Sequence, residues 1–257
     1  RFDVLAATAF EKIPGVDGVS GWVAGDLQGG VAMLDSEHLT LDLPLLFRWP
    51  LSVKGKGPLR WQRHDDERIT LQTGWMRASN KDANGRAVGE VNLTPGELPT
   101  LSLIAGIADG DAKRAPRYIP LNKLPDSVAQ WLASAFEGGY VDRGALIYEG
   151  PVKIDPDRQQ DRTLQVGIQG RNLQLHFLPG WPLVTELNAD VVIDGREIRG
   201  RNVTGRIFSA RLENANVDVP DYDTGEAPQL IIHSRVTAPA NDIQRLLQET
   251  PLREKLP

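Results

Sequence analysis

The sequence predicts a mainly β protein of antiparallel strands, interrupted by two helices. Apolar and polar residues alternate with a period of two along most of the chain, which places the apolar side chains of each strand on one face. Polar turn segments separate the alternating runs at short intervals, and this spacing is typical of hairpins rather than of βαβ units. Apolar residues at helical spacing occur in two segments.

The longest alternating run covers residues 39–53. Its odd positions are all apolar: Leu39, Leu41, Leu43, Leu45, Phe47, Trp49, Leu51 and Val53. Pro44 and Pro50 cannot donate to a strand ladder, so they indicate an edge strand or breaks between shorter strands. We expect this run to form part of a long strand surface with one unbroken apolar face.

Similar alternation recurs in shorter runs. These runs cover residues 69–71, 101–103, 164–168, 173–177, 187–193 and 230–232. The turn signals between them lie at residues 64–67, 81–85, 109–111, 169–172 and 194–196. Together they predict a series of hairpin strands.

The first predicted helix lies near residues 126–137, where Asp126 or Ser127 can cap its start. Its apolar residues, at positions i, i+3, i+4, i+7 and i+8, are Val128, Trp131, Leu132, Ala135 and Phe136. Pro125 precedes this segment, and Gly138–Gly139 supplies a stop signal.

The second predicted helix is short and lies near residues 241–250, with Pro251 at its end. Its apolar face carries Ile243, Leu246 and Leu247. Because the chain opens within an apparent element, we interpret residues 1–257 as one continuous β region of a larger protein. The helix at residues 125–139 divides this region into two possible subunits, 1–124 and 140–257.

The composition excludes several functional classes. The net charge is -5 and no basic segment is concentrated enough for a nucleic-acid footprint, so we expect no nucleic-acid partner. The absence of cysteine excludes disulfides, thiol nucleophiles and thiolate metal sites. No apolar run approaches the length of about 18 residues that a membrane-spanning helix needs.

No motif for catalysis stands out. The acidic cluster beside a histidine, residues 64–67, has the composition of a solvated hairpin turn. The sequence contains no HExxH motif, no G-x-S-x-G elbow and no dinucleotide fingerprint. The segment at residues 55–58 resembles a phosphate loop, but Pro58 lacks the N–H that such a loop requires. We therefore predict no catalytic residues, no metal and no cofactor. Paired carboxylates brought together by a β-sandwich remain an alternative.

Several segments form an ordered set that carries a family resemblance. They are residues 14–21 (PGVDGVSG), 43–47 (LPLLF), 57–61 (GPLRW), 117–120 (RYIP), the helix with Trp131 and Leu132, Gly138–Gly139, residues 146–151 (LIYEGP) and 179–182 (PGWP). In this order they resemble the central periplasmic region of the AsmA-like proteins of the YhdP type, over residues 10–250.

The resemblance implies a fold and a function. It implies a long, curled antiparallel sheet that forms a half-open, apolar groove, within a protein anchored in the inner membrane of a Gram-negative bacterium. Such proteins are expected to carry phospholipid across the periplasm toward the outer membrane, without catalytic residues. The groove residues expected on this basis are Leu39, Leu41, Leu43, Leu45, Phe47, Leu173, Leu175, Leu187, Val191, Ile193, Leu230 and Ile232.

Alternation alone does not separate this hypothesis from two others. A β-sandwich has the same pattern, with its apolar face covered by a second sheet. The chain would then be a non-catalytic envelope scaffold, or a carbohydrate-active sandwich enzyme. The choice of face in the later strands also depends on register, because a shift of one residue moves a whole row of side chains to the other side.

Overall fold

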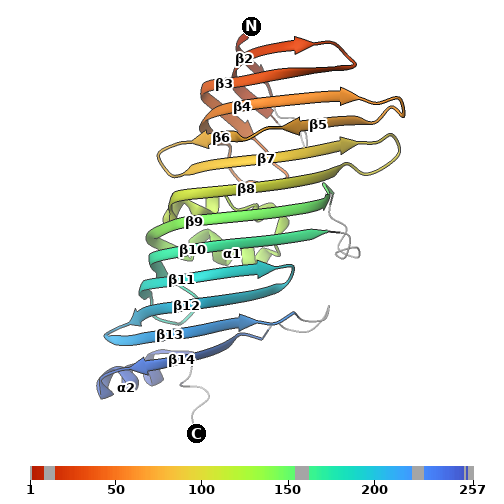
Figure 1. Ribbon diagram of the computed structural model, residues 1–257. Helices are drawn as coiled ribbons and strands as arrows, with labels where there is room; N and C mark the ends of the chain where they lie inside the picture. The colour runs from red at the N-terminus through yellow and green to blue at the C-terminus, as the bar shows by residue number, and fades with distance from the viewer. Residues whose placement is uncertain (1, 9–14, 154–161, 222–228, 252, 254–257) are drawn as a thin grey trace. The chain divides into compact units, whose positions relative to one another are not determined.

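The computed structural model describes residues 2–8, 15–153, 162–221, 229–251 and 253, and this part of the chain is mainly β (Figure 1). Its strands are β1 (Phe2–Ala7), β2 (Gly15–Gly25), β3 (Gly29–Asp42), β4 (Leu51–Arg63), β5 (Ile69–Thr73), β6 (Met76–Ser79), β7 (Asn84–Leu93), β8 (Thr100–Asp111), β9 (Phe136–Pro151), β10 (Thr163–Leu175), β11 (Val184–Asp194), β12 (Glu197–Ile207), β13 (Ala210–Val219) and β14 (Ile231–Thr237). Its helices are η1 (Ala112–Arg117) and η2 (Leu121–Lys123), both 3-10, and α1 (Asp126–Ser134) and α2 (Ala240–Glu249).

The strand order follows the order of the sequence from β1 to β14, and β6 pairs with β4 and β7, as β5 does. The pairings from β1 to β8 and from β11 to β14 have antiparallel registers. The predicted fold class, mainly β and antiparallel with two helices, is confirmed. No helix in the described part of the chain is both long and apolar enough to cross a bilayer.

Contacts divide the chain into two compact units. Unit 1 comprises residues 1–108, 117–123 and 145–165. Unit 2 comprises residues 109–116, 124–144 and 166–257. The division therefore passes through β8, β9 and β10.

In unit 1, the long apolar run at residues 39–53 does not form one strand. β3 ends at Asp42 and β4 begins at Leu51. Between them the chain turns, because the carbonyl of Leu43 accepts hydrogen bonds from the N–H groups of Leu46 and Phe47, both at 2.9 Å. Pro44 lies within this turn and Pro50 directly precedes β4, and neither proline can donate to a ladder. The expectation of one unbroken strand face across this run is wrong.

The η2 segment holds this turn in place. The side-chain amide of Asn122 donates to the carbonyls of Pro44, at 2.8 Å, and Phe47, at 3.3 Å. The neighbouring Leu121 is only 1% exposed. The turn is thus hydrogen-bonded to a segment that lies far away in the sequence.

Some of the predicted turns connect strands, and others lie within strands. Residues 64–67 and 194–196 connect β4 to β5 and β11 to β12, and residues 81–83 lie between β6 and β7, as predicted. Residues 109–111 and 169–172, however, lie within β8 and β10. Asp109 and Asn172 have φ angles of 55° and 49°, a left-handed conformation that the polar side chains of Asp and Asn tolerate better than most. These polar segments therefore mark irregularities inside strands and not chain reversals.

The first helix is shorter than predicted and has no side-chain cap. The N-cap position of α1 is Pro125, and neither Asp126 nor Ser127 caps it. The helix ends at Ser134, because the carbonyl of Ala135 accepts the backbone N–H of His176 at 2.8 Å and the chain then enters β9. Phe136 and the predicted stop at residues 138–139 consequently lie in a strand.

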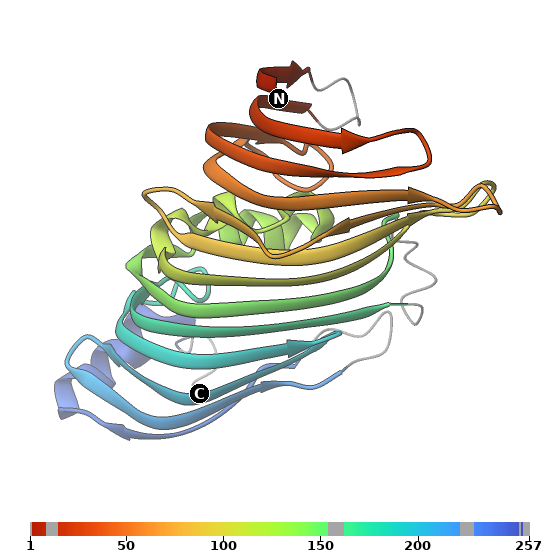
Figure 2. The same cartoon turned by 45° about the horizontal axis from the view of Figure 1, so that its top comes forward.

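Helix α2 confirms the second prediction and lies at the turn between β12 and β13 (Figures 1 and 2). The carboxylate of Asp242 accepts hydrogen bonds from the backbone N–H of Ser209, at 2.9 Å, and from its hydroxyl. The Ser209 hydroxyl holds the pKa of Asp242 below its ordinary value. The guanidinium of Arg245 stacks on the Phe208 ring at 3.9 Å, so α2 is attached to the hairpin by both polar and aromatic contacts.

Candidate functional site

The strand registers of unit 1 place most of its apolar side chains on one side of the strands, and a smaller set, including Met33, Val88 and Ile104, on the other. Leu39 lies opposite Val53 and Leu41 opposite Leu51 across β3 and β4. The same row continues through β5, β7 and β8. Its apolar members are Val23, Ala32, Leu34, Leu39, Leu41, Leu51, Val53, Leu59, Trp61, Ile69, Leu71, Ala87, Val91, Leu93, Leu101, Leu103, Ala105 and Ile107. We call this row, with its counterpart in unit 2, the apolar face.

Large side chains of this face lie flat over glycines of the adjoining strand. A Cβ atom on Gly55 would be 2.7 Å from Cδ2 of Leu39, and one on Gly30 would be 2.2 Å from Cζ2 of Trp61. The Trp61 indole N–H donates to the carbonyl of Asp26 at 2.8 Å, which fixes its orientation. The glycines therefore give these side chains room against the sheet.

Unit 1 has little buried core under or over this face. Among its described residues, Leu39 and Leu121 are the buried hydrophobic side chains. Val23 and Ile69, both on the apolar face, are 53% and 36% exposed. A face covered by a second sheet would bury such residues almost completely. Among the residues of unit 1 that the structure describes, Leu39 is the buried member of this face and the others are partly or largely exposed, so most of the apolar face is open to solvent.

In unit 2 the apolar face depends on β-bulges. The apolar positions of β10 are even-numbered up to Ile168 and odd-numbered from Leu173 onward, so a regular strand would send them to opposite sides. Asn172 adopts a φ angle of 49° at this point, and a Cβ on Gly170 would be 2.5 Å from Cδ1 of Leu173. The extra residue of the bulge shifts the alternation of side chains by one position. The apolar side chains before and after the bulge therefore lie on the same face.

Strand β12 contains a second β-bulge of the same kind. Gly200 lies opposite Val217 and Val203 opposite Ala215, so β12 has one residue more than β13 between these pairs. Asn202, with a φ angle of 54°, is the left-handed residue. The apolar positions before and after it again stay on the same side of the sheet.

At each of the two bulges, an arginine side chain makes the same pair of contacts. In β10, Nη1 of Arg171 donates to the carbonyl of Gly170 and Nη2 to Oδ1 of Asp190, both at 2.8 Å. In β12, Nη1 of Arg201 donates to the carbonyl of Gly200 at 2.8 Å, and Nη2 lies 2.6 Å from Oδ1 of Asp218. Each guanidinium thus connects a bulged strand to the next strand.

The predictions from the sequence did not identify these arginines and asparagines as bulge residues, although the sequence contains a repeated tripeptide at both bulges. The tripeptide Gly-Arg-Asn occurs at residues 170–172 and again at 200–202. Asn202 also donates from Nδ2 to Oδ2 of Asp190 at 2.8 Å. The hydrogen bonds from Asn202 and Arg171 hold the pKa of Asp190 below its ordinary value. Asp190 alternates with the apolar residues of β11, so this charge lies on the opposite side from the apolar face.

One end of the apolar face in unit 2 is covered. Its core cluster contains Ala112, Leu173, Val184, Leu187, Ala189, Val203 and Ala215. The aromatic rings of Phe136 and Phe177 pack against this cluster, and Phe177 also contacts Trp181, with ring centroids 5.2 Å apart. The indole N–H of Trp131 in α1 donates to the carbonyl of His176 at 2.8 Å, which attaches α1 near the same strand end.

The structure separates the predicted groove residues into four groups. Leu39 and Leu41 lie on the apolar face of unit 1, whereas Leu43, Leu45 and Phe47 lie in the turn between β3 and β4. On the apolar face of unit 2, the predicted residues are Leu173, Leu175, Leu187, Val191, Ile193 and Ile232. Leu173 and Leu187 are buried, Leu175 and Val191 pack against them, Ile193 lies opposite Ile198 and Ile232 opposite Val217. Leu230 precedes β14 and is 48% exposed.

The acidic cluster at residues 64–67 forms a hairpin turn, as predicted, with the N–H of Glu67 donating to the carbonyl of His64 at 3.0 Å. Among the residues that the structure describes, no group of three or more histidines and carboxylates could hold a metal ion.

Comparisons with known proteins agree in pointing to one family. The model of the family described as YhdP protein matches residues 1–257. The "Intermembrane phospholipid transporter YhdP" of Escherichia coli (strain K12) is 26% identical over 261 residues, which cover 98% of this chain and 20% of that relative. The chain therefore spans about a fifth of the length of this curated relative. No solved structure matches the chain.

Proposed function

Because the chain belongs to the YhdP protein family, we propose that it is a segment of a phospholipid carrier whose apolar face holds acyl chains. The observation that carries this proposal is the apolar face of unit 1, which extends from β2 to β8 and stays open to solvent. The name of the relative, a phospholipid transporter, supports the choice of ligand.

The physical chemistry of such a face suits acyl chains. Each buried CH₂ contributes about 0.8 kcal/mol, so a chain of about 16 carbons that loses half its exposed surface gains about 6 kcal/mol. This gain needs no fixed polar partner and no particular register between chain and protein. A face of this kind holds lipid without binding it at one point, and movement of lipid across successive strands requires this property.

The wider setting is part of the proposal. The segment acts in the periplasm of a Gram-negative bacterium, in a protein anchored to the inner membrane, and phospholipid moves toward the outer membrane. The residues that contact lipid include Leu41 in unit 1, and Val191, Ile193 and Ile232 in unit 2. The buried side chains of Leu39, Leu173 and Leu187 support the face from within.

The two alternative functions require a different arrangement of the sheet. A carbohydrate-active β-sandwich and a closed scaffold domain both need a second layer over the apolar rows. The described strands of this chain follow a single sheet order, and unit 1 buries few of its apolar side chains. These observations favour the lipid carrier over both.

Site-specific photocrosslinking tests the proposal. A photoreactive phenylalanine derivative is placed at Leu34 or Val53, on the apolar face, in the intact protein within an envelope labelled with radioactive phosphate. Matched controls carry it one residue further, at Asp35 or Lys54, on the opposite side of the same strands. The exposed ion pairs of Asp35 and Lys54 contribute little to stability, so these variants should fold.

We expect labelled phospholipid on the protein after irradiation at positions 34 and 53, and little at positions 35 and 54. The absence of label at all four positions, or equal label on both sides, would overturn the assignment of the apolar face. The first of these results would leave the scaffold as the function.

A further inference from the structure

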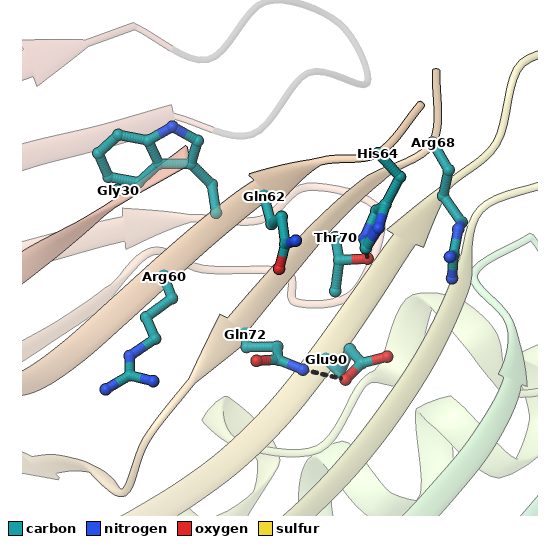
Figure 3. A pocket seen from close by; sticks show the side chains of 9 residues that line it. Gly30, Arg60, Gln62, His64, Arg68, Thr70, Gln72 and Glu90 are labelled. Atoms are coloured by element: carbon teal, nitrogen blue, oxygen red, sulfur yellow. Dashed lines mark hydrogen bonds between the residues drawn. The ribbon is translucent and has the colours of Figure 1, made fainter. Parts of the chain in front are cut away.

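A polar depression lies in unit 1 (Figure 3). Most of its polar side chains belong to the strand row opposite the apolar face, and Gly30 and Trp61 of the apolar row complete the lining. It encloses about 310 Å³, at the lower end of the range for small-molecule sites. Strands β4, β5 and β7 supply most of its lining. The side chains that matter for its chemistry are Arg60, Gln62, His64, Arg68, Gln72 and Glu90.

The strand register explains why polar groups gather there. Arg60 lies opposite Gln72 across β4 and β5, and Gln72 lies opposite Glu90 across β5 and β7. The adjoining row, with Trp61 opposite Leu71, belongs to the apolar face. Because side chains alternate along each strand, the polar row and the apolar row point away from each other.

The floor of the depression is held by a chain of hydrogen bonds. The Thr70 hydroxyl donates to Oδ1 of Asn92 at 2.8 Å, so it accepts from Nε2–H of His64 at 3.0 Å. The side-chain amides of Asn92 and Gln72 donate to the two oxygens of Glu90, at 2.8 Å and 2.6 Å. Thr70 is only 8% exposed, so this hydrogen-bonded hydroxyl lies at the bottom of the depression.

These bonds also determine the charge of the site. The amides of Asn92 and Gln72 hold the pKa of Glu90 below its ordinary value, with a smaller contribution from Arg68, so this carboxylate is ionised at neutral pH. Both of its oxygens already accept hydrogen bonds. Among the lining residues, Arg60 and Arg68 are the cations beside the carboxylate of Glu90, and the carboxylate of Asp66 lies next to Arg68.

The two arginines stand at opposite sides of the hydrogen-bonded floor (Figure 3). Arg60 forms no hydrogen bond or ion pair with any residue that the structure describes. Nε of Arg68 is 3.6 Å from a carboxylate oxygen of Asp66, a long ion pair at the surface. Both guanidinium groups therefore have donors available for a ligand.

We propose that this depression binds the oxyanion of a small phosphate ester, with Arg60 and Arg68 as its charged anchors and Gln62 as a neutral donor. Guanidinium groups match the geometry of phosphate oxygens and form strong, charge-assisted hydrogen bonds with them. The volume is large enough for a phosphate with its glycerol or sugar. The site goes beyond the proposed function, because most of its polar side chains lie on the other side of the sheet and it does not depend on acyl chains.

A phosphate ester could come from a soluble metabolite or from a lipid headgroup, and two binding assays separate these sources. Calorimetric titration uses inorganic phosphate and glycerol phosphate with the intact protein. Co-sedimentation uses vesicles of phosphatidylglycerol, with vesicles of phosphatidylcholine as the neutral reference. Saturable binding in the first assay alone assigns a soluble ester, and binding to the anionic vesicles alone assigns a headgroup. Either result, or both, supports the site.

Charge-matched variants locate the binding. We expect R60Q and R68Q each to weaken binding by about tenfold or more, as the loss of a charged hydrogen bond predicts. R77Q removes the same charge from β6, outside the depression, and should leave binding nearly unchanged. Equal loss in R77Q, or no saturable binding of any of these probes, would overturn the proposal. The photocrosslinks at positions 34 and 53 do not depend on these arginines, so the two proposals fail independently.

Discussion

The bulge at Asn202 makes a quantitative prediction about stability. At a φ angle of 54°, a β-branched residue in place of Asn202 costs about 1–2 kcal/mol in backbone strain. Loss of the bond from Nδ2 to Asp190, at 2.8 Å and partly exposed to water, costs about 1 kcal/mol more. We therefore expect N202V to lower the free energy of unfolding by about 2–3 kcal/mol. N202G loses the hydrogen bond without the strain, and should cost about 1 kcal/mol.

Urea unfolding followed by circular dichroism measures both variants. The control is N216V in β13, where the same replacement is made in a strand position without a left-handed φ angle. This control should change the free energy of unfolding by no more than about 0.5 kcal/mol, because valine suits a strand. If N202V proves no less stable than N202G, the left-handed residue is not required and the explanation of the continuous apolar face in unit 2 is wrong.

Three further predictions concern single contacts. G30A should displace the Trp61 indole, since its Cβ would lie 2.2 Å from Cζ2, and should cost about 1–3 kcal/mol; a shift in tryptophan fluorescence that is absent in a W61F background checks this. W131F removes the bond to the His176 carbonyl at 2.8 Å and should cost about 1 kcal/mol in urea unfolding, and an unchanged midpoint would contradict it. Asp190 has a lowered pKa in the folded state, so its stabilising contribution is present above about pH 4 and is lost as the pH falls through the folded pKa. Urea midpoints should accordingly fall more steeply below pH 4 in the wild type than in D190N, and identical slopes would refute this origin.

The sequence by itself determined the class of fold and the nature of its surface. A period of two is a local property, since it follows from the direction of successive side chains along a strand. The alternating runs therefore located strands, except at residues 43–50, where the chain turns, and the helical spacing located both helices. The short turn at residues 194–196 is similarly local, because Gly195 has a φ angle of 59° that glycine adopts freely.

Local patterns could not locate irregularities that depend on a neighbouring strand. Residues 169–172 have the composition of a turn, yet they form a bulge because Arg171 bonds across to β11 and the apolar row must continue on one face. The early end of α1 has a similar cause, since Ala135 is bonded to His176 and the chain leaves the helix for the sheet.

The candidate site shows the same distinction between local and tertiary information. Alternation identified Leu39 and Leu41 as members of an apolar row, and Leu173, Leu187 and Val191 as members of another. Only the tertiary structure decided that no second layer of described residues covers the row in unit 1, and that a core cluster closes one end of the row in unit 2. The exposure of a side chain is set by what packs against it from elsewhere in the chain, and a period of two contains no information about that partner.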